Sequence, residues 1–146
     1  MLRGNYPATV DGKGRLKIPT AFKVYLDETF GPDYYVTSLD GQFVRAYPFS
    51  VWRKIEDKLA ALPSMNKAKK KFLDRANYWG QAARMDGQGR ILIPSLLRES
   101  AAMKGEVAVI GYLDYLDVWN MERFREHLQH NPLTEDDEQT LSGLGI

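Results

Sequence analysis

The chain has 146 residues, no cysteine and a net charge of +1, with 44% hydrophobic and 27% charged residues. This composition is ordinary for one domain or two small units, and the lack of cysteine excludes disulfides, thiol nucleophiles and cysteine-ligated zinc. With so little net charge, attraction to a polyanion must come from a local surface. Residues 1–7 lack the apolar core of a signal peptide, and no apolar run reaches membrane-spanning length, so nothing predicts export or membrane insertion.

The first part of the chain predicts short strands around turns, with one helix between them. Pro19 ends a β-type run and suits the first position of a helix, because proline cannot donate to a ladder. Asp40-Gly41 between two β-type runs is a hairpin signal. The predicted elements are strands at 5–10, 15–18, 34–39 and 43–47, and a helix at 20–27.

A pair of helices is predicted between the two halves of the chain. Ser50 is a candidate N-cap for a helix that Pro63 ends, and Ser64 can begin a second one. Two apolar stripes recur at helical spacing: Val51, Trp52, Ile55, Leu59 and Leu62, then Met65, Ala68, Phe72, Ala76 and Trp79. The run Lys67, Lys69, Lys70 and Lys71 is better explained as the solvated face of this helix than as a second nucleic-acid contact.

The remaining part of the chain repeats the earlier elements. A strand at 81–85 opens it, a helix follows Pro94 with a plausible stop at Lys104-Gly105, and the last helix covers about 121–129. Strands are expected at 107–110 and 115–119. After Pro132 an acidic tail with no basic residue is predicted to be solvated and mobile.

Residues 11–19 and 86–94 are two copies of one motif, Asp-Gly-x-Gly-Arg-[Leu/Ile]-x-Ile-Pro, which are 75 residues apart. The glycines allow positive φ and the aspartate can bond its own loop, so each copy predicts a tight turn with an arginine just beyond it. The residues expected to shape the loops are Asp11, Gly12, Gly14, Asp86, Gly87 and Gly89. We therefore divide the chain into unit 1 (5–49), a linking helix pair (50–80), unit 2 (81–124), and a C-terminal helix end with the acidic tail (125–146).

Arg15 and Arg90 are the candidate binding residues, because the five-donor guanidinium fork suits phosphate or a guanine edge. The alternative is an ion pair within each loop, and the two interpretations are compatible. Residues 1–25 carry a local charge of +4 and residues 81–98 a local charge of +2, so the first copy is expected to supply more of the phosphate attraction.

Other chemistries find little support in the sequence. Asp11 and Asp86 could form an acid/base pair or a metal site, but no third ligand, histidine or nucleophile accompanies either copy. We expect no catalytic residue, no metal and no cofactor, and the two-glycine turn lacks the third glycine of a dinucleotide site. His127 and His130 are interpreted as surface or subunit-contact residues. The three tryptophans are expected in the core or an interface: Trp52, Trp79 and Trp119.

The residues resemble the MraZ family of bacterial transcriptional regulators, which are built from two SpoVT–AbrB-type units. The resemblance covers about residues 1–130 and rests on the opening Arg3-Gly4-x-Tyr6, both Asp-x-x-x-Arg turns with their trailing Ile-Pro, the helix pair and the repeat spacing. It implies an α+β fold in which tandem AbrB-type swapped-hairpin units form one pseudo-two-fold β-barrel with peripheral helices.

The resemblance also implies a function. It implies ring-shaped homo-oligomers that bind double-stranded DNA at direct repeats, in the promoter of the division and cell-wall gene cluster that includes the regulator's own gene. We expect a cytoplasmic, nucleoid-associated regulator that acts as a repressor, although the resemblance itself leaves open whether the protein represses or activates. The expected DNA-binding residues are Arg15, Arg90, Lys13, Lys17 and Arg3. The alternative is a ring-forming protein-interaction or antitoxin-like module, although such antitoxins usually have one unit and a long disordered tail.

Overall fold

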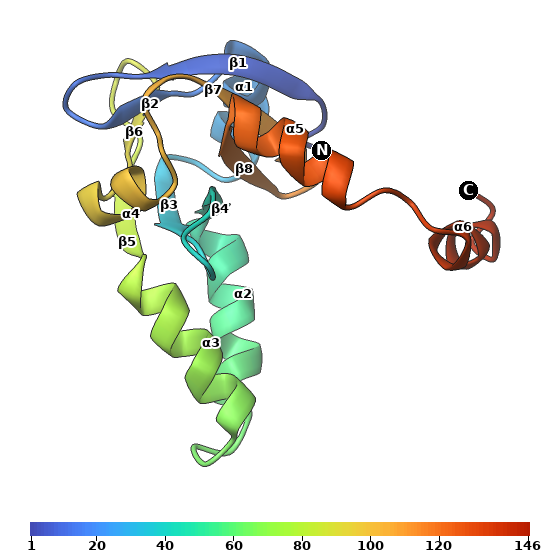
Figure 1. Ribbon diagram of the computed structural model, residues 1–146. Helices are drawn as coiled ribbons and strands as arrows, with labels where there is room; N and C mark the ends of the chain where they lie inside the picture. Colours follow the sequence, from blue (N-terminus) through green and yellow to red (C-terminus); the bar gives the residue numbers. More distant parts are fainter.

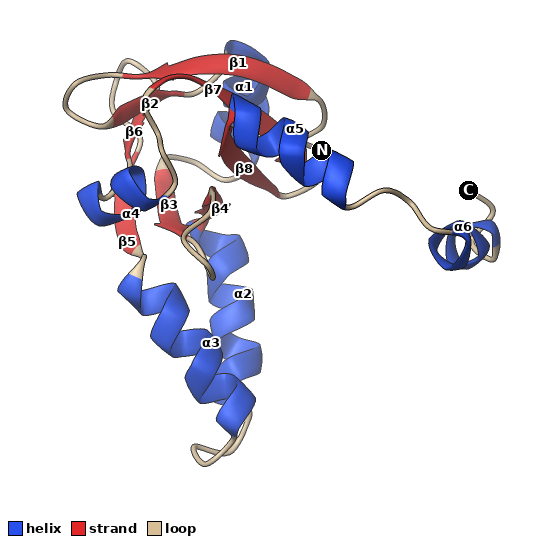
Figure 2. Ribbon diagram, in the orientation of Figure 1, coloured by secondary structure: helices blue, strands red, loops and turns tan.

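The computed structural model describes residues 1–146, and its centre is an eight-stranded antiparallel sheet that curls into a nearly closed barrel (Figures 1 and 2). The strand order is β5-β3-β4-β8-β7-β1-β2-β6. Because β5 and β6 are the two arms of one hairpin, the two edges of the sheet come together. The strands are β1 (Asn5–Val10), β2 (Arg15–Lys17), β3 (Asp33–Thr37), β4 (Val44–Pro48), β5 (Gln81–Arg84), β6 (Arg90–Leu92), β7 (Gly105–Tyr112) and β8 (Tyr115–Asn120).

The two units exchange hairpin arms. β1 of the first unit pairs with β7 of the second, and β5 of the second unit pairs with β3 of the first. The equivalent strands β2 and β6 pair with each other, as do β4 and β8. A pseudo-two-fold axis therefore passes through the β2–β6 contact and the β4–β8 contact. The predicted α+β fold, with swapped hairpins in one barrel, is confirmed.

The barrel interior is one apolar core of 20 buried residues, and both sequence motifs contribute to it equally. Leu16 and Ile18 point inward from the first motif, and Ile91 and Ile93 point inward from the second; each is at most 2% exposed. Because side chains alternate along a strand, burying Leu16 and Ile91 turns their neighbours outward. The packing of the motif thus decides which side chains it presents to solvent.

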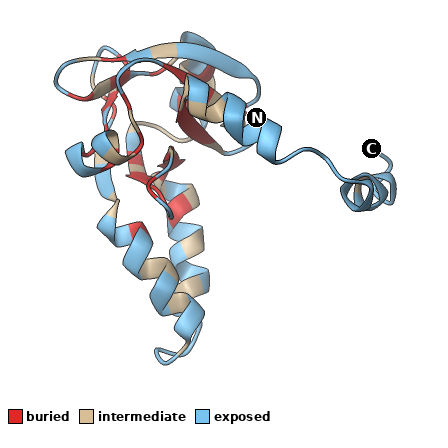
Figure 3. Cartoon of the chain, in the orientation of Figure 1, coloured by how far each residue is buried: buried red, intermediate tan, exposed pale blue.

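Three helices lie around the barrel and two project from it (Figure 1): α1 (Thr20–Thr29), α4 (Ser95–Ser100) and α5 (Met121–His130) are peripheral, whereas α2 (Phe49–Ala60) and α3 (Lys67–Tyr78) form a projecting hairpin. Figure 3 shows that this hairpin is buried only where it meets the barrel. There Trp52 stacks on Tyr35 with 4.6 Å between ring centroids, and Tyr35 and Thr37 both donate hydrogen bonds to the carbonyl of Ala76.

Several predicted helix ends are wrong. Pro48 occupies the N-cap of α2 in place of Ser50, because its fixed φ lets the chain pass directly from β4 into the helix. Asn66 caps α3 by accepting a hydrogen bond from the Lys69 amide, so Ser64 does not begin that helix. Met65, the first residue of the predicted stripe, therefore lies before the helix and is 89% exposed.

The structure also differs from the prediction toward the C-terminus. The helix after Pro94 ends at Ser100, before the predicted stop at Lys104-Gly105. Ala102, just beyond this helix, turns the chain with a φ of 53°. The acidic tail contains α6 (Glu135–Ser142), which begins with a capping box between Thr134 and Asp137. The structure places α6 away from the barrel, with almost every residue exposed (Figure 1). None of the six helices has the length and apolar composition needed to cross a bilayer.

Candidate nucleic-acid interface

The two motif turns have the same backbone geometry. In the first, the Asp11 amide donates to the Arg15 carbonyl at 3.0 Å and the Gly14 amide donates to the Asp11 carbonyl at 2.9 Å. The second turn repeats these bonds between Asp86 and Arg90 at 2.9 Å and between Gly89 and Asp86 at 3.0 Å. Gly14 and Gly89 have φ of 84° and 74°, which explains why the motif requires glycine at this place.

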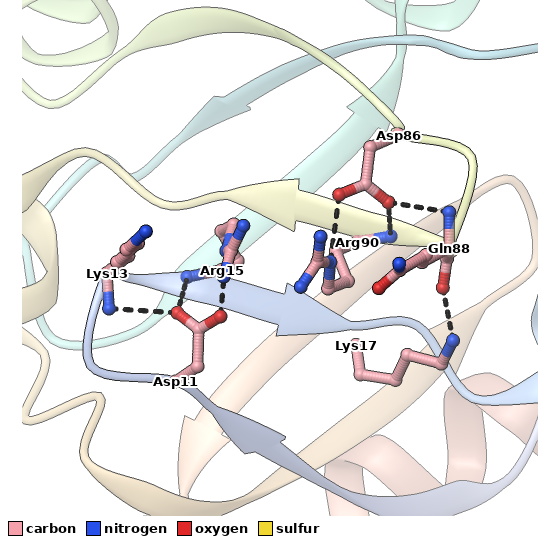
Figure 4. A network of polar contacts seen from close by, with 7 residues as sticks. All are labelled: Asp11, Lys13, Arg15, Lys17, Asp86, Gln88 and Arg90. Atoms are coloured by element: carbon pink, nitrogen blue, oxygen red, sulfur yellow. Dashed lines mark hydrogen bonds and ion pairs between the residues drawn. The ribbon is translucent and has the colours of Figure 1, made fainter.

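Each turn aspartate also organises its loop through its side chain (Figure 4). In the first turn, Oδ1 of Asp11 accepts hydrogen bonds from the amides of Lys13 and Arg15, both at 2.9 Å, and Oδ2 accepts one from Nε of Arg15 at 2.7 Å. The second turn has the equivalent bonds from Asp86 to the amides of Gln88 and Arg90 and to Nε of Arg90. The ion pair considered as the alternative interpretation is therefore present in both loops.

These bonds keep both carboxyls ionised. The backbone hydrogen bond from Arg15, helped by its side chain and by the Lys13 amide, lowers the pKa of Asp11 from 3.8 to about 2. The pKa of Asp86 is lowered by the corresponding bond from the Arg90 backbone. A carboxylate that is ionised at neutral pH holds its guanidinium by charge as well as by a hydrogen bond.

Both guanidiniums remain available to a ligand. Each aspartate engages only Nε, and neither terminal nitrogen of Arg15 or Arg90 has a hydrogen-bond partner within the chain. The two side chains are 33% and 25% exposed. Each arginine can therefore donate two parallel hydrogen bonds outward from an orientation that its aspartate already fixes, which is the geometry needed for a guanine edge or a phosphate.

The β2–β6 pairing brings the two arginines onto one surface. Arg15 lies opposite Leu92, Leu16 opposite Ile91, and Lys17 opposite Arg90. Lys17 therefore belongs spatially to the second turn, where its Nζ donates to the Gln88 carbonyl (Figure 4). The cations of the first copy are therefore divided between the two ends of the β2–β6 ribbon: Lys13 and Arg15 lie at one end, and Lys17 lies at the other beside Arg90.

Two further cations that were not singled out as binding residues lie at the turns. A Cβ added to Gly14 would lie 1.5 Å from a guanidinium nitrogen of Arg98, and one added to Gly89 would lie 2.9 Å from Cε of Lys23. Lys23 of α1 therefore lies over the turn of the second unit, and Arg98 of α4 lies over the turn of the first unit. Lys23 and Arg98 are 75 residues apart, so aligning the repeats beyond Pro19 and Pro94 would have revealed them.

The structure separates other candidates from this surface. Arg3 follows Leu2, which bridges to Leu113, and so lies at the end of β1 remote from the first turn. Asp11 and Asp86 lie on opposite sides of the paired strands (Figure 4), each paired with its own arginine, so they cannot form an acid/base dyad. The chain contains no group of three or more histidine, cysteine or acidic residues that could hold a metal.

The remaining candidates lie outside the turn surface. His127 and His130 are exposed on α5, and the lysine run lies mainly on the solvated face of α3. Two tryptophans are core residues, with Trp52 3% and Trp119 7% exposed, and Trp79 packs against the main core from its edge.

Comparisons with known proteins identify the family of this chain. A family model described as the MraZ protein, with the qualifier antitoxin-like, matches residues 1–75 and 80–143. A protein named Transcriptional regulator MraZ from Acidobacterium capsulatum is 51% identical over 146 residues, covering 100% of both chains. Proteins of the same name from Koribacter versatilis and Pediococcus pentosaceus are 51% and 34% identical, over 100% and 94% of this chain. The chain therefore belongs to the MraZ family.

Proposed function

We propose that this protein is a DNA-binding transcriptional regulator and not an enzyme, and that the β2–β6 ribbon with its two turns is the DNA-binding surface. The single observation that carries this proposal is the pair of guanidiniums that point outward, each fixed through Nε and free at both terminal nitrogens. An ion pair with the aspartate uses only Nε, so it would not explain why both copies leave the two terminal nitrogens of the arginine unpaired. The names of the relatives, all transcriptional regulators, support the same function.

The dimensions of the ribbon suit a DNA groove. A two-stranded antiparallel ribbon fits the major groove, which is about 12 Å wide. Arg15 and Arg90 are diagonal neighbours on adjacent strands, since Arg15 faces Leu92 and Arg90 faces Lys17. Diagonal neighbours lie about 7–8 Å apart, and successive bases of one DNA strand are about 3.4 Å apart. The two arginines can thus reach bases two steps apart, while Lys13 and Lys17 contact the phosphates.

We further propose that the protein acts as a ring-shaped homo-oligomer on direct repeats, and that it represses the promoter of the division and cell-wall genes that include its own gene. One subunit offers two base-reading arginines and few phosphate contacts, so its affinity alone is weak. A ring that presents the same pair several times raises the effective concentration of each further contact. An operator made of direct repeats would place one binding site under each of several subunits. A protein bound in this way would be associated with the nucleoid.

The test is binding of fluorescent genomic fragments, selected from bulk DNA by the purified protein. We expect Arg15→Ala and Arg90→Ala each to abolish specific binding, because the guanidiniums are the base-reading groups, while fold and oligomer are kept. The matched control is Arg53→Ala, which removes an exposed arginine on α2 and should bind normally. If the Arg15→Ala, Arg90→Ala double variant binds like the wild type, this function is wrong.

A protein-interaction role is the second candidate. The matching family description carries the qualifier antitoxin-like. In addition, α6 and the outer part of the α2–α3 hairpin are exposed and could contact a partner protein. Affinity purification after nuclease treatment separates the two functions. A stoichiometric protein partner that remains bound without nucleic acid would favour the interaction role. Loss of every partner on nuclease treatment would favour DNA binding.

A further inference from the structure

The DNA-facing ribbon has a symmetry that matters for how it can dock. Leu16 and Ile91 are equivalent positions of the two motifs, and they face each other in the β2–β6 ladder. The pseudo-two-fold axis therefore passes between them. A half-turn about this axis exchanges the two turns and superposes Arg15 on Arg90. If the rest of the surface obeyed the same symmetry, one subunit would bind a DNA site equally well in two opposite orientations.

Two pairs of outward-facing residues break this symmetry. Equivalent positions at the loop tips are Lys13 and Gln88, and equivalent positions on the strands are Lys17 and Leu92. Across the ladder, Leu92 lies beside Arg15 and Lys17 lies beside Arg90. Arg15 is thus accompanied by a cation at its loop tip, Lys13, and by an apolar neighbour across the ladder, Leu92. Arg90 is accompanied by an amide at its loop tip, Gln88, and by a cationic neighbour across the ladder, Lys17.

Leu92 is an exposed apolar residue at a position where its symmetry mate is a lysine. It is 48% exposed, and it lies on the outward face of β6 directly opposite Arg15 in the ladder. Its symmetry mate Lys17 uses the same position to extend a charge along the surface and donates to the Gln88 carbonyl. An apolar side chain of this size beside a base-reading arginine matches one feature of the major groove, the C5-methyl group of thymine.

We propose that Leu92 is a specificity-determining residue that contacts a thymine methyl next to the base read by Arg15, and that the difference between Leu92 and Lys17 makes each subunit dock in one orientation. This inference rests on the DNA-binding function proposed above. In the correct orientation the methyl meets Leu92 and a phosphate meets Lys17. In the reversed orientation the ammonium of Lys17 faces the methyl and Leu92 faces the phosphate, so both contacts are lost.

The first experiment replaces single thymines by deoxyuridine in a site selected from a random duplex library. This change removes one methyl group and nothing else. We expect the wild type to lose about fourfold in affinity at one thymine, since a buried methyl is worth about 0.8 kcal/mol. Leu92→Ala should bind the thymine and uracil sites equally, with the affinity of the wild type for the uracil site. The matched control is Leu96→Ala, which removes a leucine of similar exposure, 46%, on α4 and should keep the fourfold effect.

The outcomes separate this inference from the proposed function. Failure of the wild type to select any DNA would refute the proposed function itself. Selective binding in which no deoxyuridine substitution matters, or in which Leu92→Ala keeps the same sensitivity, would overturn the role of Leu92 alone. A Leu92→Ala variant that changes oligomeric state, measured by light scattering, and keeps the methyl effect would assign Leu92 to a subunit contact instead.

The second experiment measures orientation directly. Because the chain has no cysteine, Ser95→Cys on α4 gives a single thiol for an attached DNA-cleaving reagent. We expect the labelled Ser95→Cys protein, with no other change, to cut the DNA on one side of a single binding site. The symmetrising variant Gln88→Lys with Leu92→Lys, labelled in the same way, should cut on both sides. One-sided cleavage by both proteins would show that these residues do not set the orientation.

Discussion

Asp11 and Asp86 each make two kinds of contact, and this combination explains why the motif contains both an aspartate and an arginine. One carboxylate oxygen accepts the backbone amides that close the turn, and the other accepts Nε of the arginine. The same residue that shapes the loop therefore orients the arginine that we propose to bind DNA. An arginine that is already held in place would lose less side-chain entropy on binding than a free one.

Titration of Asp11 tests this coupling. Because folding lowers the pKa of Asp11 from 3.8 to about 2, its stabilising contribution is fully present above pH 3.8 and is lost as the pH falls toward 2. Arg15→Ala removes the side-chain bond but keeps the backbone amides, so the pKa should rise part of the way toward 3.8. A carboxyl carbon NMR titration measures it. Arg90→Ala should leave the Asp11 midpoint unchanged, and an unchanged midpoint in Arg15→Ala would mean that the ion pair is absent in solution.

At the scale of the turn, the glycines of one motif have different requirements. Gly14 has a φ of 84° and its missing Cβ would meet the Arg98 guanidinium, whereas a Cβ on Gly12 would meet nothing within 4 Å. We expect Gly14→Ala to reduce the free energy of unfolding by about 1–2 kcal/mol, the cost of a left-handed alanine. Gly12→Ala should change it by less than about 0.5 kcal/mol. Urea denaturation measures both, and equal losses would contradict this explanation of the motif.

Trp52 is the main aromatic contact of the projecting hairpin with the barrel, beside the hydrogen bonds to the Ala76 carbonyl. Trp52 is 3% exposed and stacks on Tyr35, whereas Met65 near the hairpin tip is 89% exposed. Trp52→Ala should therefore lower the free energy of unfolding by about 3–5 kcal/mol, the usual cost of removing a buried tryptophan. Met65→Ala should stay within about 0.5 kcal/mol of the wild type. Similar denaturation midpoints for the two variants would mean that the hairpin is not anchored through Trp52.

Residue patterns predicted the turns and strands, and the barrel followed from the family resemblance, but neither predicted the exact helix ends or the side-chain neighbours across paired strands. The turns and strands around Asp11 and Asp86 were predictable because glycine, proline and alternation act over a few residues. Helix ends such as Asn66 were not, since several polar residues compete for one cap. The position of Lys17 beside Arg90 was also hidden, because it depends on the register between β2 and β6. Side-chain placement across paired strands requires this long-range information.

At the scale of the whole molecule, fusing the two units in one chain permits contacts that identical subunits could not make. Arg45 and Asp117 are equivalent positions of the two units and face each other in the β4–β8 ladder, on the pseudo-two-fold axis. In a symmetric dimer of single units, each residue would meet its own copy there. Here Arg45 donates two hydrogen bonds to Asp117, at 2.8 and 3.2 Å, and its guanidinium lies 4.4 Å from the ring centre of Tyr115.

Exchange of these two residues tests the pseudo-symmetry. The side chain of Asp117 is 4% exposed, so Arg45→Ala leaves a buried carboxylate without its partner and should cost about 3–5 kcal/mol of stability at neutral pH. The double variant Arg45→Asp, Asp117→Arg should recover most of this loss, because the two positions are equivalent. As a control, Arg84→Ala breaks an exposed pair with Asp33 and should cost at most about 1 kcal/mol.

The pH dependence gives an independent check on the same pair. Burial raises the pKa of Asp117 above 3.8, and the hydrogen bonds from Arg45 oppose that rise. Without Arg45 the pKa should rise further, so that the folded state binds a proton that the unfolded state releases. The stability of Arg45→Ala relative to the wild type should therefore improve as the pH falls from 7 toward 4. A deficit independent of pH, or an exchanged variant no more stable than Arg45→Ala, would show that the pair does not act as a buried ion pair on the axis.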